Sequence, residues 1–118
     1  MIQKTVDLYA HFGIPKAEGI RGILTCQSAG EKVICTEKRR IPAVLVIPGG
    51  GYAFTSEREA EPIALHFLTR GYAAFTLYYT CAPHGFPVAL REAAMAMRYI
   101  RENADAFGVE PSMVAAMG

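Results

Sequence analysis

Three largely apolar runs occur in the second part of the chain, at residues 43–47, 72–78 and 113–117. A strand that is buried on both faces is apolar at successive positions and not only at alternate ones. Each run is also short enough for a strand and too short for an ordinary helix. The pattern therefore predicts three strands inside a parallel sheet.

The interval between the first two runs predicts a helix. Its apolar side chains recur at the spacing of one helix face, at Ala60, Ile63, Ala64, Phe67 and Leu68. Ser56 followed by Glu59 indicates a capping box, whereas Pro62 is typical of a first helical position. We therefore expect a short turn at Ser56, a second helix start near Pro62, and Gly71 just past the helix end.

The next interval predicts a longer helix that Pro87 opens and Gly108 closes. Its apolar stripe consists of Leu90, Ala93, Ala94, Met97, Ile100, Ala104 and Phe107. The charged residues expected on its water-facing side are Arg91, Glu92, Arg98, Glu102 and Asp105. Because helices that join parallel strands form right-handed units, residues 42–118 are expected to form βαβαβ, a part of a three-layer α/β sheet.

The first part of the chain, residues 1–41, contains only short apolar runs. Two of them, at 23–26 and 33–35, flank a turn-forming stretch at 28–31. We interpret the two runs as an antiparallel hairpin at the edge of the sheet.

Composition and charge narrow the class of protein. The 118 residues amount to one small domain or a part of a larger one, and 52% apolar with 19% charged residues is typical of a folded chain. A net charge of +1 with no basic block beyond residues 38–40 argues against nucleic acid and anionic membrane as partners. Cys26, Cys35 and Cys81 lack metal-ligand spacing and fit a reducing compartment. With no signal-like start and no apolar stretch of about 18 residues, a cytoplasmic location is expected.

The loop after the first apolar run carries three consecutive glycines, Gly49, Gly50 and Gly51. Each glycine costs about 0.5–1 kcal/mol of backbone entropy relative to alanine in a regular element. A tight turn would explain one of them, whereas three favour a loop whose N–H groups face an anion, either a phosphate or a transient oxyanion. Phe54 stands where a dinucleotide fingerprint needs its third glycine, and no G-K-[ST] follows, so the oxyanion is favoured.

A set of sequence blocks in the expected order supports this interpretation. Residues 42–118 resemble the amino-terminal half of an α/β-hydrolase of the esterase and lipase group, in particular the bacterial acetyl-esterase or carbohydrate-esterase-like members related to hormone-sensitive lipase. The blocks lie at 42–52, 56–62, 71–75, 79–83, 86–90, 100–104 and 114–118. One departure is Pro48, which stands where many members of the group have histidine.

The resemblance implies roles for several residues. Gly50 and Gly51 would supply the two loop amides of an oxyanion hole, and Gly49 would permit the turn. The residues implied at the substrate are Tyr52, as a wall of the acyl pocket, and Tyr79 and His84 on the alcohol side.

The resemblance also implies what lies outside this sequence. Gly118 matches the first glycine of the nucleophile motif G-x-S-x-G, so the serine would stand two residues beyond it, with the acid and the histidine later. No residue of a Ser-Asp-His triad is therefore expected in the chain, and the 118 residues alone are expected to be inactive. Residues 1–118 would be the amino-terminal part of one domain with the α/β-hydrolase fold, in which 1–41 form edge strands and 42–118 form βαβαβ.

The expected function of the complete protein is serine-type hydrolysis of carboxylic esters, with acetyl, short-acyl or acetylated-carbohydrate substrates. Neither a metal nor a cofactor is implied, and the expected partners are a small ester together with a second copy or the missing carboxyl-terminal half. Three alternatives stay open: a non-catalytic fragment or ligand-binding module, a peptidase or lipase of the same fold, and a phosphate site at the glycines.

Overall fold

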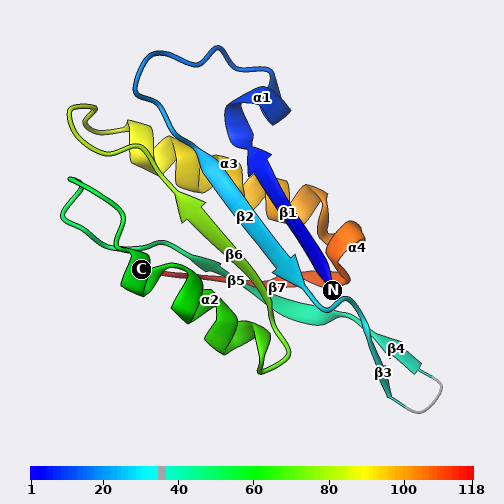
Figure 1. Cartoon of the computed structure of the whole chain (residues 1–118). Helices are drawn as coiled ribbons and strands as arrows, with labels where there is room; N and C mark the ends of the chain where they lie inside the picture. The colour runs from blue at the N-terminus through cyan, green and yellow to red at the C-terminus, as the bar shows by residue number, and fades with distance from the viewer. Residues whose placement is uncertain (35–36) are drawn as a thin grey trace.

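The computed structural model describes residues 1–34 and 37–118 (Figure 1). In chain order the elements are β1 (Ile2–Asp7), α1 (Leu8–Phe12), β2 (Ile23–Ser28), β3 (Lys32–Ile34), β4 (Glu37–Arg39), β5 (Ile41–Val46), the 3-10 helix η1 (Glu57–Glu59), α2 (Glu61–Leu68), β6 (Ala73–Tyr78), α3 (Val88–Glu102), α4 (Ala104–Phe107) and β7 (Val109–Met117).

The central feature is a five-stranded sheet in the order β1-β2-β6-β5-β7. β5 pairs in parallel with β6 on one side and with β7 on the other. β2 is antiparallel to both β1 and β6. The three apolar runs thus form the three parallel strands, and the predicted α/β fold with its βαβαβ segment is confirmed.

Helices cover the two faces of this sheet unequally (Figure 1). On one face Ala43 and Leu45 belong to the larger core with residues of α1, α3 and α4. On the other face Val44 and Val46 pack with Ala64 of α2. Because consecutive residues of β5 enter different cores, the strand must be apolar at every position, which is the pattern in its sequence.

The predicted hairpin between residues 23–26 and 33–35 is wrong. An antiparallel pair does lie at this edge of the sheet, but β2 pairs with β1 there, while β3 pairs with β4 in a separate two-stranded sheet. The buried Ser28 hydroxyl donates to the Phe107 carbonyl at 2.6 Å and accepts from the Gly30 amide at 3.0 Å. This anchoring directs the chain out of the sheet, so that it does not return along β2. Cys35 lies outside the described residues.

The two-step start of the first long helix is confirmed. η1 precedes α2, which begins at Glu61 with Pro62 in its first turn. The capping box is wrong, because the Ser56 side chain makes no capping hydrogen bond. The first turn is instead closed by the backbone, where the Glu59 amide donates to the Ser56 carbonyl at 3.1 Å.

The second long helix is divided in two and buries one charge. α3 ends at Glu102, the side-chain amide of the next residue, Asn103, donates to the Tyr99 carbonyl, and α4 follows and ends just before Gly108. Glu92, expected on the water-facing side, is completely buried, whereas Leu90 of the predicted apolar stripe is 61% exposed. Leu90 is exposed because it borders a cavity at the start of the helix, whereas Glu92 is buried because it accepts hydrogen bonds from Thr80 and Tyr9.

The third apolar run differs from the other two in burial. β7 is the last strand at its edge of the sheet, and Met113 and Met117 are exposed, so this run is not buried on both faces. None of the helices within residues 1–34 and 37–118 combines the length and the hydropathy that a membrane crossing requires.

Candidate active site

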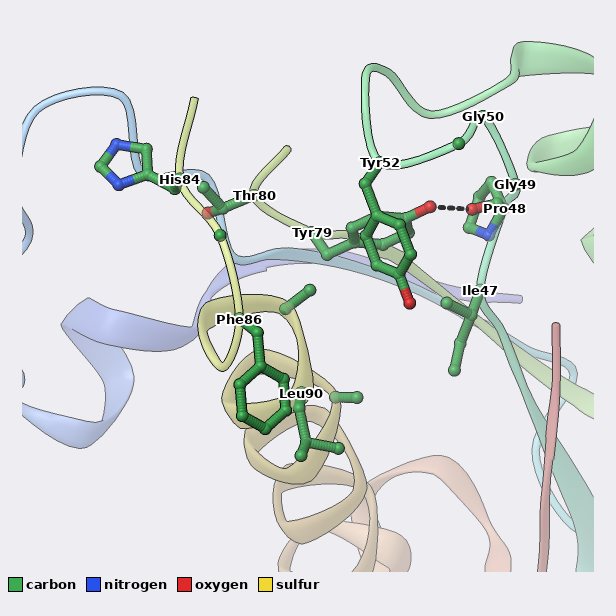
Figure 2. Close-up of a pocket in the computed structure, with 14 residues that line it drawn as sticks. Ile47, Pro48, Gly49, Gly50, Tyr52, Tyr79, Thr80, His84, Phe86 and Leu90 are labelled. Carbon is green, nitrogen blue, oxygen red and sulfur yellow. Dashed lines mark hydrogen bonds between the residues drawn. The ribbon is translucent and has the colours of Figure 1, made fainter. Parts of the chain in front are cut away.

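A cavity of about 680 Å³ opens where β5 and β6 end and α3 begins (Figure 2). Ligands of parallel α/β sheets bind at this end of the strands. The lining residues are Ile47, Pro48, Gly49, Gly50, Gly51, Tyr52, Tyr79, Thr80, His84, Gly85, Phe86, Ala89, Leu90 and Ala93. The cavity therefore brings the three glycines together with Tyr52, Tyr79 and His84, the residues that the resemblance implies at the substrate.

The glycine loop, residues 48–52, adopts a backbone that few side chains tolerate. Gly50 has φ +151°, and a Cβ added there would lie 2.0 Å from the Phe54 carbonyl oxygen. Alanine at this position would therefore force the loop to move. Tyr52 itself has φ +62°, a left-handed conformation that costs a non-glycine residue about 1–3 kcal/mol. Such stored strain is common at functional sites.

Hydrogen bonds occupy four carbonyls of this loop and leave amides free. The Pro48 carbonyl accepts from the Tyr79 hydroxyl (2.5 Å), Gly49 from the Ser56 amide (2.8 Å), Gly50 from the Ala53 amide (3.1 Å), and Tyr52 from the Ala82 amide (2.7 Å). Within the part of the chain that the structure describes, the amides of Gly50 and Gly51 donate to no protein acceptor. Two neighbouring unpartnered N–H groups at a cavity can bind an anion or stabilise a developing negative charge.

Tyr79 forms the floor beneath this loop. Its ring is buried and packs edge-to-face with Tyr52, with ring centroids 6.3 Å apart. Burial raises the pKa of the Tyr79 hydroxyl above its ordinary value, and the neighbouring Cys81, Tyr52 and Glu59 add to this. The hydroxyl therefore stays protonated and acts as a hydrogen-bond donor to Pro48 (Figure 2).

The wall opposite the glycine loop is apolar. Phe86 and Leu90, at the start of α3, are 89% and 61% exposed and border the cavity (Figure 2). Leu90 thus belongs to the apolar stripe of the helix, but its end of the stripe faces the cavity and not the core. A mostly apolar cavity with a few convergent polar groups is typical of small-molecule sites.

A buried carboxylate fixes the loop that follows β6. The Thr80 amide and hydroxyl donate to the two oxygens of Glu92, each at 2.6 Å, and the Tyr9 hydroxyl donates to Glu92 Oε2 at 2.7 Å. Burial raises the pKa of Tyr9 above its usual range, and the Glu92 carboxylate raises it further, so the phenol remains a donor. Sequence reasoning missed this cluster, because neither Thr80 nor Tyr9 forms a motif with Glu92.

Arg21 links the same cluster to Thr55, which lies shortly after the glycine loop. Its amide donates to Thr80 Oγ1 at 2.9 Å, and its guanidinium donates to the Thr55 hydroxyl at 3.1 Å. The guanidinium also lies over the Tyr78 ring, 5.5 Å from the centroid. The segment before β2 therefore contributes to the support of both cavity loops.

His84 lies at the other end of the cavity. Its Nε2 is 2.9 Å from the Glu18 carbonyl, and Figure 2 shows the imidazole turned away from the glycine loop. The structure thus places His84 at the border of the site, with its ring directed toward the chain before β2. Among residues 1–34 and 37–118, no three His, Cys, Asp or Glu side chains are grouped to hold a metal ion.

Comparisons with known proteins place the chain in a family. The family model described as BD-FAE matches residues 34–118. Endo-1,4-beta-xylanase B of Butyrivibrio fibrisolvens is 38% identical over 81 residues, which cover 64% of this chain and 12% of the xylanase.

Solved structures extend the similarity to the whole chain. MGS-M1, an α/β hydrolase enzyme from a Medee basin deep-sea metagenome library, has a TM-score of 0.82 and 37% identity over 100% of this chain and 46% of its own. The acetyl ester-xyloside bifunctional hydrolase of Caldicellulosiruptor lactoaceticus has a TM-score of 0.70 and 26% identity over 80% of this chain and 32% of its own.

The chain spans less than half the length of each of these relatives. Within that span, the family match and the similarity to solved structures agree on the fold. The chain belongs to the BD-FAE family, and its fold is that of the α/β-hydrolase enzymes.

Proposed function

We propose that the protein containing this chain is a serine-type carboxylic ester hydrolase, in which the Gly50 and Gly51 amides form part of the oxyanion hole. The observation that carries the proposal is the pair of unpartnered amides at the cavity, each beside a carbonyl that is already hydrogen bonded. Donors held in advance of the reaction stabilise charge without reorganisation when that charge develops.

The reaction would be acyl transfer. A serine hydroxyl attacks the ester carbonyl and forms a tetrahedral intermediate, whose oxyanion accepts hydrogen bonds from Gly50, Gly51 and the amide after the serine. The alcohol then leaves, and water hydrolyses the acyl-enzyme. In this proposal Gly118 is the first glycine of G-x-S-x-G, and the serine, the acid and the histidine follow this sequence.

The substrates proposed are small acetyl or short-acyl esters, including acetylated carbohydrates. A cavity of about 680 Å³ is within the usual size range for small-molecule sites. Two of the relatives above are named as a xylanase and as an acetyl ester-xyloside hydrolase, and these names favour carbohydrate esters. A cytoplasmic location and the absence of a cofactor belong to the same proposal.

The test is hydrolysis of p-nitrophenyl acetate by the full-length protein and by Gly50→Ala. We expect the variant to lose about 100-fold or more in kcat/KM, because its Cβ would displace the loop amides. Gly30→Ala is the matched control: Gly30 also has a positive φ, +82°, but has open space around a Cβ and does not line the cavity. An inactive full-length protein, or a Gly50→Ala variant as active as the control, would contradict the proposal.

A further inference from the structure

We propose that Tyr79 is the positioning residue of the glycine loop: its hydroxyl orients the first peptide plane of the loop, and Glu92 keeps Tyr79 in place through Thr80. This inference rests on the proposed function for its catalytic consequence. The positioning of the loop by Tyr79 is inferred from hydrogen bonds alone and has its own test.

The loop consists of peptide planes that need separate restraints. A peptide unit is planar and trans, so fixing a carbonyl oxygen also fixes the N–H of the next residue in the opposite direction. Glycine leaves the rotation between neighbouring planes almost free. Each of the three planes from Pro48 to Gly51 therefore requires a hydrogen bond of its own if the Gly50 and Gly51 amides are to point steadily into the cavity.

The structure supplies one such bond per plane, and the first differs from the others. The carbonyls of Gly49 and Gly50 are held by the amides of Ser56 and Ala53, which are near neighbours in the chain. The Pro48 carbonyl is held by the Tyr79 hydroxyl, 31 residues away and at the end of another strand. Tyr79 thus ties the start of the loop to the segment after β6, whereas the other two bonds join the loop only to the residues that directly follow it.

Tyr79 is itself held firmly. Its ring is buried, and the backbone of the next residue is clamped because the Thr80 amide and hydroxyl both donate to the buried Glu92 carboxylate. Two hydrogen bonds to one charged acceptor are stronger than bonds between neutral groups. The backbone next to Tyr79, directly after β6, is therefore anchored to α3 through Glu92, and the Tyr79 hydroxyl points to the Pro48 carbonyl of the glycine loop (Figure 2).

This role differs from a contact with the alcohol part of a substrate. The single proton of the hydroxyl is donated to Pro48, so it is not free for a ligand. A substrate contact would change mainly KM when removed. A residue that orients the oxyanion donors would change mainly kcat, because the affected interaction forms in the transition state.

The experiment compares Tyr79→Phe with Tyr78→Phe in the full-length protein. Tyr78 is the adjacent tyrosine, does not line the cavity, and its hydroxyl makes no hydrogen bond within the described part of the chain, so it is the matched control. With p-nitrophenyl acetate, we expect Tyr79→Phe to lower kcat about 10- to 100-fold with KM within about twofold, and the control to match the wild type. A raised KM with unchanged kcat would overturn the positioning role.

Hydrogen–deuterium exchange at single amides tests the geometry without any turnover. We expect the amides of Ala53 and Ser56, which donate to the Gly50 and Gly49 carbonyls, to exchange faster in Tyr79→Phe than in the wild type and in Tyr78→Phe. Equal exchange in all three proteins would overturn the inference. If the wild type hydrolyses no ester but the exchange difference is present, the proposed function fails while the positioning of the loop by Tyr79 stands.

Discussion

Replacement of Glu92 with alanine is expected to destabilise the protein strongly. Glu92 is completely buried and accepts three hydrogen bonds, two from Thr80 and one from Tyr9. A hydrogen bond to a charged group contributes about 1.5–3 kcal/mol, and a buried donor left without a partner costs about 1–3 kcal/mol. The two hydroxyls can reorient toward entering water, whereas the Thr80 amide cannot. We therefore expect the free energy of unfolding to fall by about 3–5 kcal/mol.

The assay is urea denaturation of the full-length protein, with Glu102→Ala as the control on the same helix. Glu102 is exposed and pairs with Arg98 at 3.2 Å, a surface interaction that contributes about 0–1 kcal/mol. Glu92→Gln preserves the shape and one acceptor, so about 1–2 kcal/mol of destabilisation is expected. If Glu92→Ala differed from Glu102→Ala by less than about 1 kcal/mol, the buried cluster would not support the loop as described.

Other predictions concern cysteine reactivity, pH and the isolated chain. Burial raises the pKa of Cys26 to about 12, so in the native protein it should escape alkylation by iodoacetamide at neutral pH and react only after unfolding; mass spectrometry of the labelled peptide would detect early reaction. The hydrogen bond from Lys16 lowers the pKa of Asp7, so its stabilisation is present above its unfolded pKa and is lost as the pH falls through the folded pKa. When the pH is lowered from about 5 to about 2, the free energy of unfolding of Asp7→Asn should therefore fall less than that of the wild type. Equal decreases for the two proteins in urea titrations would refute this. The 118-residue chain alone should show no turnover of p-nitrophenyl acetate, and measurable turnover would place a nucleophile inside it.

The sequence predicts best a strand that is buried at every position. Successive residues of β5 alternate between the two cores, so the continuous apolar sequence of this strand follows directly from the fold. β2 has no such signature, and its two partners are β1, a short polar–apolar stretch at the start of the chain, and β6, which is distant in the sequence. The position of β2 between β1 and β6 depends on contacts outside the local sequence, which explains why the expected hairpin was wrong.

The site shows the same difference between features that are local in the sequence and contacts between distant residues. Three consecutive glycines are a local feature, and they identified the loop that the structure places at the cavity. The bonds that support this loop join residues far apart: Tyr9 and Glu92 are separated by 83 positions, and Pro48 and Tyr79 by 31. A helical pattern predicts that a lone glutamate is exposed to solvent unless its hydrogen-bond partners are known. The burial of Glu92 could therefore be recognised only from the structure.

The most direct test of the central claim is a crystal structure of the full-length protein with a phosphonate ester bound to its nucleophile. The phosphonyl oxygen occupies the position that the oxyanion takes in the tetrahedral intermediate. The account predicts this oxygen within about 2.7–3.1 Å of the amide nitrogens of Gly50 and Gly51. An adduct whose oxygen is held by other groups, with both glycine amides beyond hydrogen-bond distance, would contradict it.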